Sequence, residues 1–316
     1  MKILVTPTSL KPESNTKAMA MLKDFSDDLV FNTTGKPLSE DQLIPLLKDC
    51  DGYIAGLDSI TQRVLDCAPK LKTISRYGAG YDNIDMKAAR SRGIIVTNTP
   101  GANAEAVGEL AFGLILSIAR KIPALYAETK NGRWPRSTGI ELAGKTLGII
   151  GLGAIGKVMA RCAFGFSMNV CAYDPFIDES YAASHHIQIC TLPQLLSQAD
   201  VISLHLPLSS STRHLINEET LSQMKDGVII INASRGGILD ETAVLKALKN
   251  GKVGGLGLDA FETEPPVGSP LLELDNVIAT PHTGAHTREA SENMALLAVT
   301  NLISVLTGKD CPHIIS

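Results

Sequence analysis

The chain has 316 residues, of which 44% are hydrophobic and 20% are charged, and its formal net charge is −4. This length can hold two domains of ordinary size, and the composition is that of a soluble globular protein. The small negative charge gives no electrostatic reason to expect a nucleic acid or an anionic membrane surface as a partner.

No segment has the pattern of an export signal or of a membrane span. The N-terminus leads directly into Lys2–Thr6, which indicates a strand, and the most apolar segment, Leu110–Ala119, is too short to cross a bilayer. The six cysteines lack Cys-x-x-Cys spacing, so reduced thiols are favoured over disulfides or a metal site. We therefore expect a cytoplasmic protein with no metal, no membrane partner and no nucleic-acid partner.

The first hundred residues alternate short apolar runs with helical segments. We expect strands at Ile3–Thr6, Tyr53–Ala55, Lys72–Arg76 and Ile94–Thr97, and helices at Ser14–Phe25, Ser39–Leu47, Thr61–Cys67 and Met86–Ser91. Ser39 and Gln42 have the spacing of a capping box, which marks the start of a helix. This alternation predicts a parallel sheet covered by helices. The region has no phosphate-binding fingerprint, so we interpret it as the substrate-side domain.

A boundary follows at Pro100-Gly101. The next segment, Ala104–Arg120, is apolar throughout and predicts a long buried helix. Beyond it, Tyr126–Ser137 is mostly polar but contains Trp134, the only tryptophan of the chain. This side chain belongs either to an ordinary core or to a subunit contact, where tryptophan is a common anchor.

The stretch Thr146–Ala160 carries the strongest local signal. A short apolar run ends at Gly151, and Gly153 and Gly156 complete the spacing G-x-G-x-x-G before a predicted helix. In a strand–turn–helix unit, this spacing lets a pyrophosphate reach the backbone amides at the start of the helix. A second apolar run then ends at Asp174, where an acid would accept hydrogen bonds from the adenosine ribose. We therefore predict dinucleotide binding.

The rest of the chain continues the same alternation. We expect strands at Val201–Leu206, Val228–Asn232, Gly254–Asp259 and Val277–Thr280, and helices ending near Lys225, at Glu241–Leu248 and at Glu289–Leu306. The last of these helices should return the chain to cover the N-terminal domain.

Four polar residues follow the later strands: Arg235, Asp259, Glu264 and His282. Ligands of such sheets bind at the carboxyl ends of the strands. Arg235 can hold a carboxylate through two hydrogen bonds, His282 can exchange a hydroxyl proton, and Glu264 can orient the imidazole. Singly, these residues have ordinary explanations, such as a turn cap or a solvated loop. We favour a functional site because all four follow the dinucleotide fingerprint.

Longer motifs give this region a family resemblance. The motifs are Gly-Leu-Gly-Ala-Ile-Gly, Tyr173-Asp-Pro175, Ala233-Ser-Arg-Gly-Gly237, Leu258-Asp-Ala-Phe, Glu264-Pro-Pro266, Pro281-His282-Thr-Gly284, Arg76–Asp85 and Asn98-Thr-Pro-Gly101. Together they resemble the D-isomer-specific 2-hydroxyacid dehydrogenases, and most closely the phosphoglycerate/hydroxypyruvate/glyoxylate branch. The resemblance runs from about residue 45 to residue 310.

The resemblance implies an α/β fold with two Rossmann-like domains, each with a parallel sheet. An NAD-binding domain at residues 100–285 would be inserted in a smaller flavodoxin-like substrate domain formed by residues 1–99 and 286–316. It further implies a homodimer, with a contact around Arg133-Trp134. The implied activity is the NAD-dependent reduction of a small 2-keto acid to the D-2-hydroxy acid, and the reverse oxidation.

The resemblance also implies roles for single residues. Arg235, Glu264 and His282 would be catalytic, with His282 as the proton donor in reduction. The cofactor would contact Gly151, Gly153, Ala154, Ile155, Gly156, Asp174, Pro207, Ala233, Ser234, Asp259 and Gly284. The substrate would meet Arg76, Gly78, Ala79 and Gly80. Since Asp174 would repel a 2′-phosphate, we expect NAD to be preferred over NADP.

One departure and two alternatives remain. Phosphoglycerate-specific members usually carry an arginine where this chain reads Ile54–Asp58, so this stretch does not predict recognition of a phosphate, and Arg76 is left as an anion partner. The same scaffold also serves as an NADH-sensing binding protein of the corepressor type, with little turnover. A third alternative is the oxidation of formate or phosphonate on the same fold.

Overall fold

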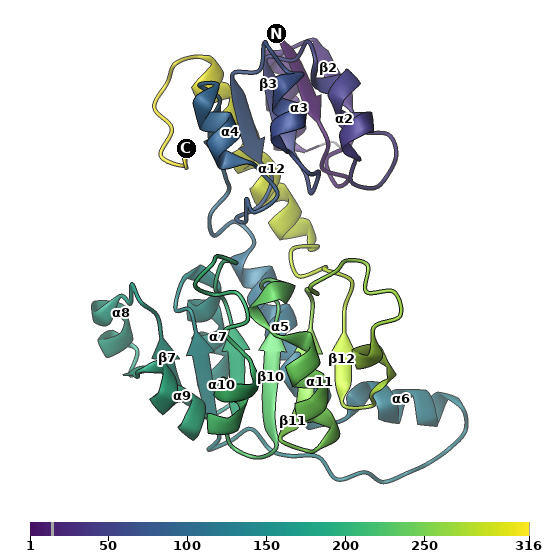
Figure 1. Ribbon diagram of the computed structural model, residues 1–316, viewed down its shortest axis with the longest axis vertical. Helices are drawn as coiled ribbons and strands as arrows, with labels where there is room; N and C mark the ends of the chain where they lie inside the picture. The colour runs from purple at the N-terminus through teal and green to yellow at the C-terminus, as the bar shows by residue number, and fades with distance from the viewer. Residues whose placement is uncertain (14–15, 316) are drawn as a thin grey trace. The chain divides into compact units, whose positions relative to one another are not determined.

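The computed structural model describes residues 1–13 and 16–315, and the chain divides into two compact units (Figure 1). Unit 1 consists of Met1–Asn103 together with the C-terminal segment from His286, and unit 2 consists of Ala104–Ala285. Each unit is built around a sheet in which every strand pair is parallel. The fold class expected from the sequence is therefore confirmed.

Unit 1 contains a five-stranded sheet in the order β2-β1-β3-β4-β5. Its strands are β1 (Lys2–Val5), β2 (Asp28–Phe31), β3 (Gly52–Ala55), β4 (Thr73–Arg76) and β5 (Ile95–Thr97). The central strands β3 and β4 are buried along their whole length, as expected for a parallel sheet covered on both faces.

Among the described residues of unit 1, five helices cover this sheet: α1 (Lys17–Phe25), α2 (Glu40–Leu47), α3 (Gln62–Asp66), α4 (Met86–Ser91) and α12 (Arg288–Leu306). The capping box predicted at Ser39 and Gln42 is present at the start of α2. The last helix, α12, packs against α1 and against β3, β4 and β5, so it covers the N-terminal sheet as the sequence predicted.

Unit 2 contains a seven-stranded sheet in the order β12-β11-β10-β9-β6-β7-β8. Its strands are β6 (Thr146–Ile150), β7 (Asn169–Tyr173), β8 (Gln188–Ile189), β9 (Val201–Leu204), β10 (Val228–Asn232), β11 (Val253–Leu258) and β12 (Val277–Ala279). The chain runs outward in one direction from β6 to β8 and in the other from β9 to β12. The topological switch point, where such sheets bind ligands, therefore lies between β6 and β9.

Helices lie on both faces of the unit 2 sheet. They are α5 (Ala104–Ala119), α6 (Ile122–Lys130), α7 (Ala154–Gly165), α8 (Glu179–Ser184), α9 (Leu192–Gln198), α10 (Glu218–Gln223) and α11 (Glu241–Lys249). Two single turns, η1 (Gly236–Ile238) and η2 (Pro270–Glu273), complete the unit. Helices α5 and α7 share one hydrophobic core with the sheet, whereas α9, α10 and α11 share the other.

Several short elements were not expected from the sequence. Helix α6 has no buried residue: its apolar residues Ile122, Leu125 and Tyr126 follow helical spacing but lie outside the core. Strands β2 and β8 are edge strands with little burial, and α8 and α9 are less than two turns long. The predicted helix start at Ser14 lies outside the described residues, and α1 begins at Lys17 after the cap Thr16.

Two apolar regions, Trp134 and the helix pair α5–α6, bear on the expectations of a core tryptophan and of no membrane span. Trp134 is 81% exposed, so it is not part of the core of this chain. No single helix of the described part is both long and apolar enough to cross a membrane, although α5 and α6, bent by 65° at their junction, reach that length and composition as a pair.

Candidate active site

The glycine-rich turn joins β6 to the N-terminus of α7. Gly153 is the N-cap of α7, and the position of its absent Cβ has no neighbouring atom within 4 Å. A Cβ at Gly156 would instead lie 2.2 Å from the Gly151 carbonyl oxygen, so this glycine lets the helix pack against the turn. Ala154 is exposed and Ile155 is half-buried. The backbone at the start of α7 is therefore open to a ligand, as phosphate binding at a helix N-terminus requires.

Asp174 follows β7 and is tied to the same turn. One carboxylate oxygen accepts a hydrogen bond from the Leu152 amide at 2.9 Å, and the other accepts one from the Phe176 amide at 2.8 Å. Each oxygen has a second lone pair, so the carboxylate can also accept a ribose hydroxyl. These contacts fix Asp174 beside the glycine turn, where the sequence predicted it.

The ends of β9 and β10 are shaped by residues that the sequence analysis did not single out. The buried Asn232 side chain accepts from the Ser234 amide and hydroxyl at 3.1 and 2.8 Å, and it donates to the Arg235 carbonyl at 2.8 Å. It therefore sets the turn that contains Ala233, Ser234 and Arg235. The sequence signal that could have identified Asn232 is a polar residue at the end of an apolar strand. Pro207, after β9, is exposed, and its carbonyl accepts from the Thr212 hydroxyl at 2.7 Å.

His205 lies at the end of β9, at the switch point between Gly151 and Ala233. Its amide donates to the Ile150 carbonyl, and its Nε2 lies 2.8 Å from the Ser203 hydroxyl oxygen. Although solvent reaches part of the residue, Nδ1 is buried and has no hydrogen-bond partner among the described residues. Burial lowers the pKa of His205 to about 3, so the ring is neutral.

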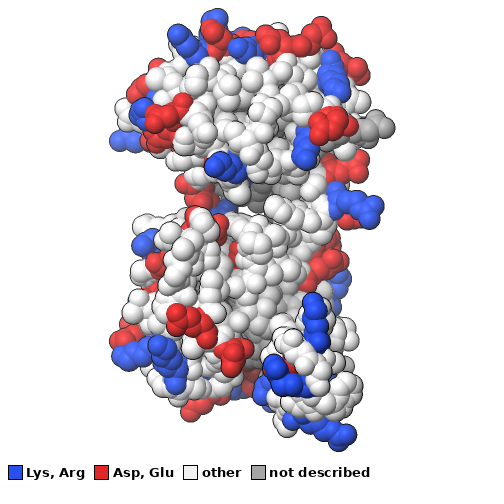
Figure 2. All heavy atoms as spheres, turned by 90° about the vertical axis from the view of Figure 1, so that its right-hand side faces the viewer, with Lys and Arg blue, Asp and Glu red and all other residues white. Residues whose placement is uncertain are grey.

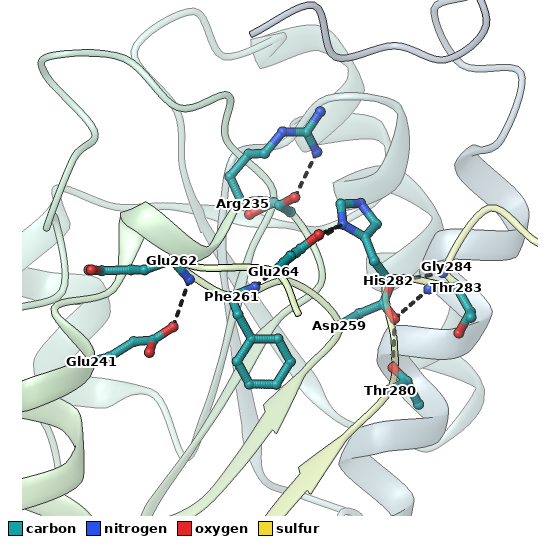
Figure 3. Close-up of polar contacts among 11 residues, drawn as sticks. Arg235, Glu241, Asp259, Phe261, Glu262, Glu264, Thr280, His282, Thr283 and Gly284 are labelled. Atoms are coloured by element: carbon teal, nitrogen blue, oxygen red, sulfur yellow. Dashed lines mark hydrogen bonds and ion pairs between the residues drawn. The ribbon is translucent and has the colours of Figure 1, made fainter. Parts of the chain in front are cut away.

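Glu264 and His282 form a hydrogen-bonded pair after β11 and β12 (Figure 3). Nδ1 of His282 lies 3.0 and 2.8 Å from the two carboxylate oxygens of Glu264, and about a third of each side chain is exposed. The Phe261 amide also donates to Glu264, at 3.0 Å. Burial by itself would raise the pKa of Glu264, but the hydrogen bonds from His282 and Phe261 and the charges of His282 and Arg235 outweigh it and lower the pKa.

Arg235 comes from the turn after β10 and completes this group. Its Nη1 donates to the Ser234 carbonyl at 2.8 Å, and its positive charge helps to lower the pKa of Glu264. Figure 3 shows that Arg235, Glu264 and His282 come from three separate segments of unit 2. A cation, a carboxylate and an imidazole thus gather at one edge of the sheet.

Asp259 supports the loop that carries His282. The residue is 2% exposed, and its carboxylate accepts from the Thr280 hydroxyl at 2.6 Å and from the Thr283 and Gly284 amides at 2.8 and 2.7 Å. His282 itself has a φ of +52°, which non-glycine residues rarely adopt. These three hydrogen bonds hold the strained loop in place, so the main role of the Asp259 carboxylate is to support this loop.

The candidate substrate residues of unit 1 differ in availability. Arg76 is 5% exposed, and its Nη1 donates to the Tyr77 carbonyl. The Gly78 amide donates to the Thr99 hydroxyl at 2.9 Å. Within the described part of the chain, the amides of Ala79 and Gly80 donate no hydrogen bond. These two amides are therefore the better candidates to bind an anion.

The stretch Ile54–Asp58 contains a buried acid that the sequence analysis did not interpret. Asp58 is 1% exposed and accepts hydrogen bonds from the Thr6 hydroxyl, from the Tyr53 hydroxyl at 2.9 Å and from the Leu38 amide at 2.6 Å. Burial, followed by the charge of Asp58, raises the pKa of Tyr53 well above its usual value. This network is closed to ligands.

Known proteins resemble the chain over most of its length. A family model described as "D-isomer specific 2-hydroxyacid dehydrogenase, NAD binding domain" matches residues 112–284, which is more than half of the chain. D-3-phosphoglycerate dehydrogenase of Methanocaldococcus jannaschii is 44% identical over 283 residues, which cover 88% of this chain and 54% of that protein. Hydroxypyruvate reductase of Thermotoga maritima is 43% identical over 282 residues, which cover 87% of this chain and 91% of that protein.

A solved structure agrees with these relatives. The crystal structure of D-lactate dehydrogenase from Aquifex aeolicus, complexed with NAD and lactic acid, is 32% identical, has a TM-score of 0.86, and is matched over 97% of this chain and 96% of that chain. The chain spans about half the length of the D-3-phosphoglycerate dehydrogenase relative. The match to the NAD binding domain falls within unit 2, so NAD is the cofactor of this unit. The chain belongs to the D-isomer-specific 2-hydroxyacid dehydrogenase family.

Proposed function

We propose that this protein reduces a small 2-keto acid to the D-2-hydroxy acid with NADH, and catalyses the reverse oxidation with NAD. The observation that carries the proposal is the His282–Glu264 pair, 2.8 Å apart at its closer contact, beside the charge of Arg235. A proton-exchanging imidazole next to a carboxylate-binding cation suits chemistry on a 2-keto acid. We assign residues 100–285 to NAD binding, and residues 1–99 and 286–316 to the substrate domain.

The residues of unit 2 fit NAD. The absent Cβ of Gly153 at the start of α7 has no neighbouring atom within 4 Å, and Gly156 keeps the turn close to the helix. We assign the pyrophosphate to Gly151, Gly153, Ala154 and Ile155, and the adenosine ribose to Asp174. The nicotinamide half would lie along Pro207, Ala233, Ser234, Asp259 and Gly284. When bound, NADH supplies the hydride that reduces the carbonyl carbon of the substrate.

The chain's own groups would then bind the substrate and move its proton. Arg235 binds the substrate carboxylate through its guanidinium fork. Since Nδ1 of His282 is held by Glu264, Nε2 is the ring atom that delivers the proton to the carbonyl oxygen. Glu264, whose pKa is lowered, stays ionised and stabilises the imidazolium. In unit 1 we propose the Ala79 and Gly80 amides as anion-binding donors, with Arg76 and Gly78 shaping their loop.

Among small 2-keto acids we favour hydroxypyruvate and glyoxylate over a phosphorylated substrate. The stretch Ile54–Asp58 contains no cation, and its only charge is the buried carboxylate of Asp58. Arg76 is likewise buried. A phosphate needs accessible cationic donors. Asp58 is not a cation, and the guanidinium of Arg76 is not accessible.

We also propose a homodimer formed through the arm at residues 120–137. Ile122, Tyr126 and Trp134 expose much of their apolar surface there, as interface anchors do before assembly. Figure 2 shows lysine and arginine side chains gathered at the lower right of the viewed face. The arm itself contains five basic residues: Arg120, Lys121, Lys130, Arg133 and Arg136. All six cysteines are free, in keeping with the cytoplasmic location that we propose.

The function is tested by measuring NADH oxidation with hydroxypyruvate, glyoxylate, pyruvate and 3-phosphohydroxypyruvate. We expect turnover with at least one unphosphorylated acid, and a D-configured product by chiral chromatography. Tight NADH binding without turnover of any of the four acids would contradict the proposal, and would leave an NADH-binding protein instead.

A further inference from the structure

A second histidine–glutamate pair lies on the segment that carries Glu264. Nε2 of His214 lies 2.7 Å from a carboxylate oxygen of Glu262, and roughly a third of each side chain is exposed. Glu262 is two residues before Glu264. Figure 3 shows the two side chains leaving the segment in opposite directions, Glu264 towards His282 and Glu262 away from it. The segment is therefore held on one side by His282 and on the other by His214.

The backbone of Glu262 is held as well. Its amide donates to the Glu241 carboxylate at 2.8 Å. Glu241 is the first residue of α11, a helix whose N-terminus is capped by the Asp240 side chain. Glu241 is half-buried, and burial raises the pKa of its carboxyl group while the Glu262 amide opposes this. The contact thus ties the segment to a regular helix rather than to a loose loop.

The segment also packs directly on the turn that carries Arg235. A Cβ at Gly236 would lie 1.8 Å from the Phe261 carbonyl carbon and 2.2 Å from the Glu262 nitrogen. Only glycine allows this approach. The Phe261 amide in turn donates to the Glu264 carboxylate. Movement of Phe261 or Glu262 would therefore change the position of Glu264 relative to both His282 and Arg235.

We propose that Glu241 and His214 are positioning residues that hold Glu262, and so keep the Glu264 carboxylate in hydrogen-bonding contact with Nδ1 of His282. Neither residue needs to touch the substrate or the cofactor. The inference rests on the proposed function, because it assigns the Glu264–His282 pair to the reaction. A purely structural role would make these contacts ordinary surface interactions, which contribute little to stability and nothing to turnover.

The main test compares two substitutions of Glu241. Glu241→Ala removes the acceptor of the Glu262 amide, and we expect kcat to fall about 10-fold or more, because small displacements of reacting groups are costly. The KM for NADH should change less than about 2-fold, since the glycine turn is elsewhere. Glu241→Gln keeps an oxygen that accepts the amide, so it should restore kcat to within about 3-fold of wild type. Lys246→Ala is the matched control on α11, because it removes only an exposed ion pair with Glu218.

A second measurement does not depend on turnover. The ¹⁵N resonance of Nδ1 in His282 reports its hydrogen bond, and we expect it to shift in Glu241→Ala and in His214→Ala but not in Glu241→Gln or Lys246→Ala. His214→Ala removes a partly exposed side chain, so it carries the test if Glu241→Ala does not fold. Wild-type kcat and an unshifted resonance in both alanine variants would overturn the inference. Equal losses in Glu241→Ala and Glu241→Gln would also overturn it, by pointing to charge rather than position. Failure of the proposed function is separate: wild-type protein would then turn over none of the keto acids.

Discussion

Both units place polar residues at the carboxyl ends of parallel strands, yet the two groups differ in how far their hydrogen-bonding capacity is used. In unit 1, Asp58 is buried and receives hydrogen bonds from Thr6, Tyr53 and Leu38. In unit 2, Glu264 and His282 bond to each other but remain about a third exposed. The same location in the fold therefore holds a closed network in one unit and an open one in the other.

The difference shows which features separate a structural polar cluster from a reactive one. A buried carboxylate whose partners are all protein groups stabilises the fold, because leaving those donors unpaired would be costly. A reactive group must instead keep one face for the substrate. Asp259 lies in unit 2 but follows the unit 1 pattern, since three protein donors hold it. Neighbourhood alone thus does not make a residue reactive.

The largest expected effect comes from removing the imidazole of His282. His282→Ala should lower kcat by about 10²- to 10⁴-fold, the usual contribution of a proton-transferring group, while the Kd for NADH changes less than about 2-fold. His186→Ala is the matched control, because His186 is exposed and has a similar φ of +56°. Equal losses of turnover and NADH affinity would remove His282 from its assigned role. Stopped-flow turnover and fluorescence titration measure the two quantities.

The closed network of unit 1 should respond in the opposite way. Asp58→Ala removes the acceptor of three buried donors, of which the Thr6 and Tyr53 hydroxyls, 3.2 Å apart, can still bond to each other. We therefore expect the free energy of unfolding to fall by about 2 kcal/mol with little change in NADH affinity. Tyr53→Phe, which removes one hydroxyl, should cost about 1 kcal/mol. Urea unfolding followed by circular dichroism measures both. If Asp58→Ala abolished turnover at unchanged stability, Asp58 would be a reactive group like Glu264 and His282. The contrast between a closed network in unit 1 and an open one in unit 2 would then be wrong.

Replacing Arg235 tests the cation of the open cluster. Arg235→Lys keeps the charge but loses the planar fork, and losing one charge-assisted hydrogen bond should raise the KM for the keto acid about 10- to 100-fold. Arg161→Lys serves as the control, because Arg161 is an exposed residue paired with Glu105. Steady-state kinetics at saturating NADH measure the effect, and an unchanged KM would show that the guanidinium does not bind the substrate.

The most gradual effect concerns His205, whose pKa is lowered to about 3 by burial. The folded protein keeps this ring neutral, whereas the unfolded chain protonates it below about pH 6.5. Its contribution to stability is therefore full above pH 6.5, and is lost as the pH falls from 6.5 towards 3, by up to about 1.4 kcal/mol per pH unit. His205→Gln should flatten this part of the stability profile. Parallel profiles of the two proteins between pH 7 and pH 5 would refute the buried neutral ring.

Local features of the sequence predicted the parts of the fold that depend on neighbouring residues. The strand and helix around Gly151 were predictable because the glycine spacing and the flanking apolar runs lie within fifteen residues. The capping box at Ser39 was predictable for the same reason. Helix α6 was not, because its apolar residues Ile122, Leu125 and Tyr126 span little more than one turn and none of them is buried.

The candidate site could be predicted as a set of residues but not as a network. Because Arg235, Glu264 and His282 are polar and follow apolar strands, the sequence indicated that they lie together at the carboxyl ends of these strands. The three donors that hold Asp259, the role of Asn232 in the β10 turn and the closed network around Asp58 depend on contacts between distant segments. Nothing in the local sequence records these pairings. They emerge only when the strands are placed side by side.

The division of unit 1 between the two ends of the chain has a consequence for synthesis on the ribosome. Helix α12 completes this unit: the Ser75 hydroxyl donates to the Ala298 carbonyl, and the Asn301 side chain donates to the Asn98 carbonyl, each at 2.8 Å in a buried setting. All of unit 2 is translated before α12. Domains fold as units while the chain emerges. Unit 2 is therefore the first part able to fold, and the earliest-made sheet must wait, with β3, β4 and β5 uncovered on one face, for the last helix to leave the exit tunnel.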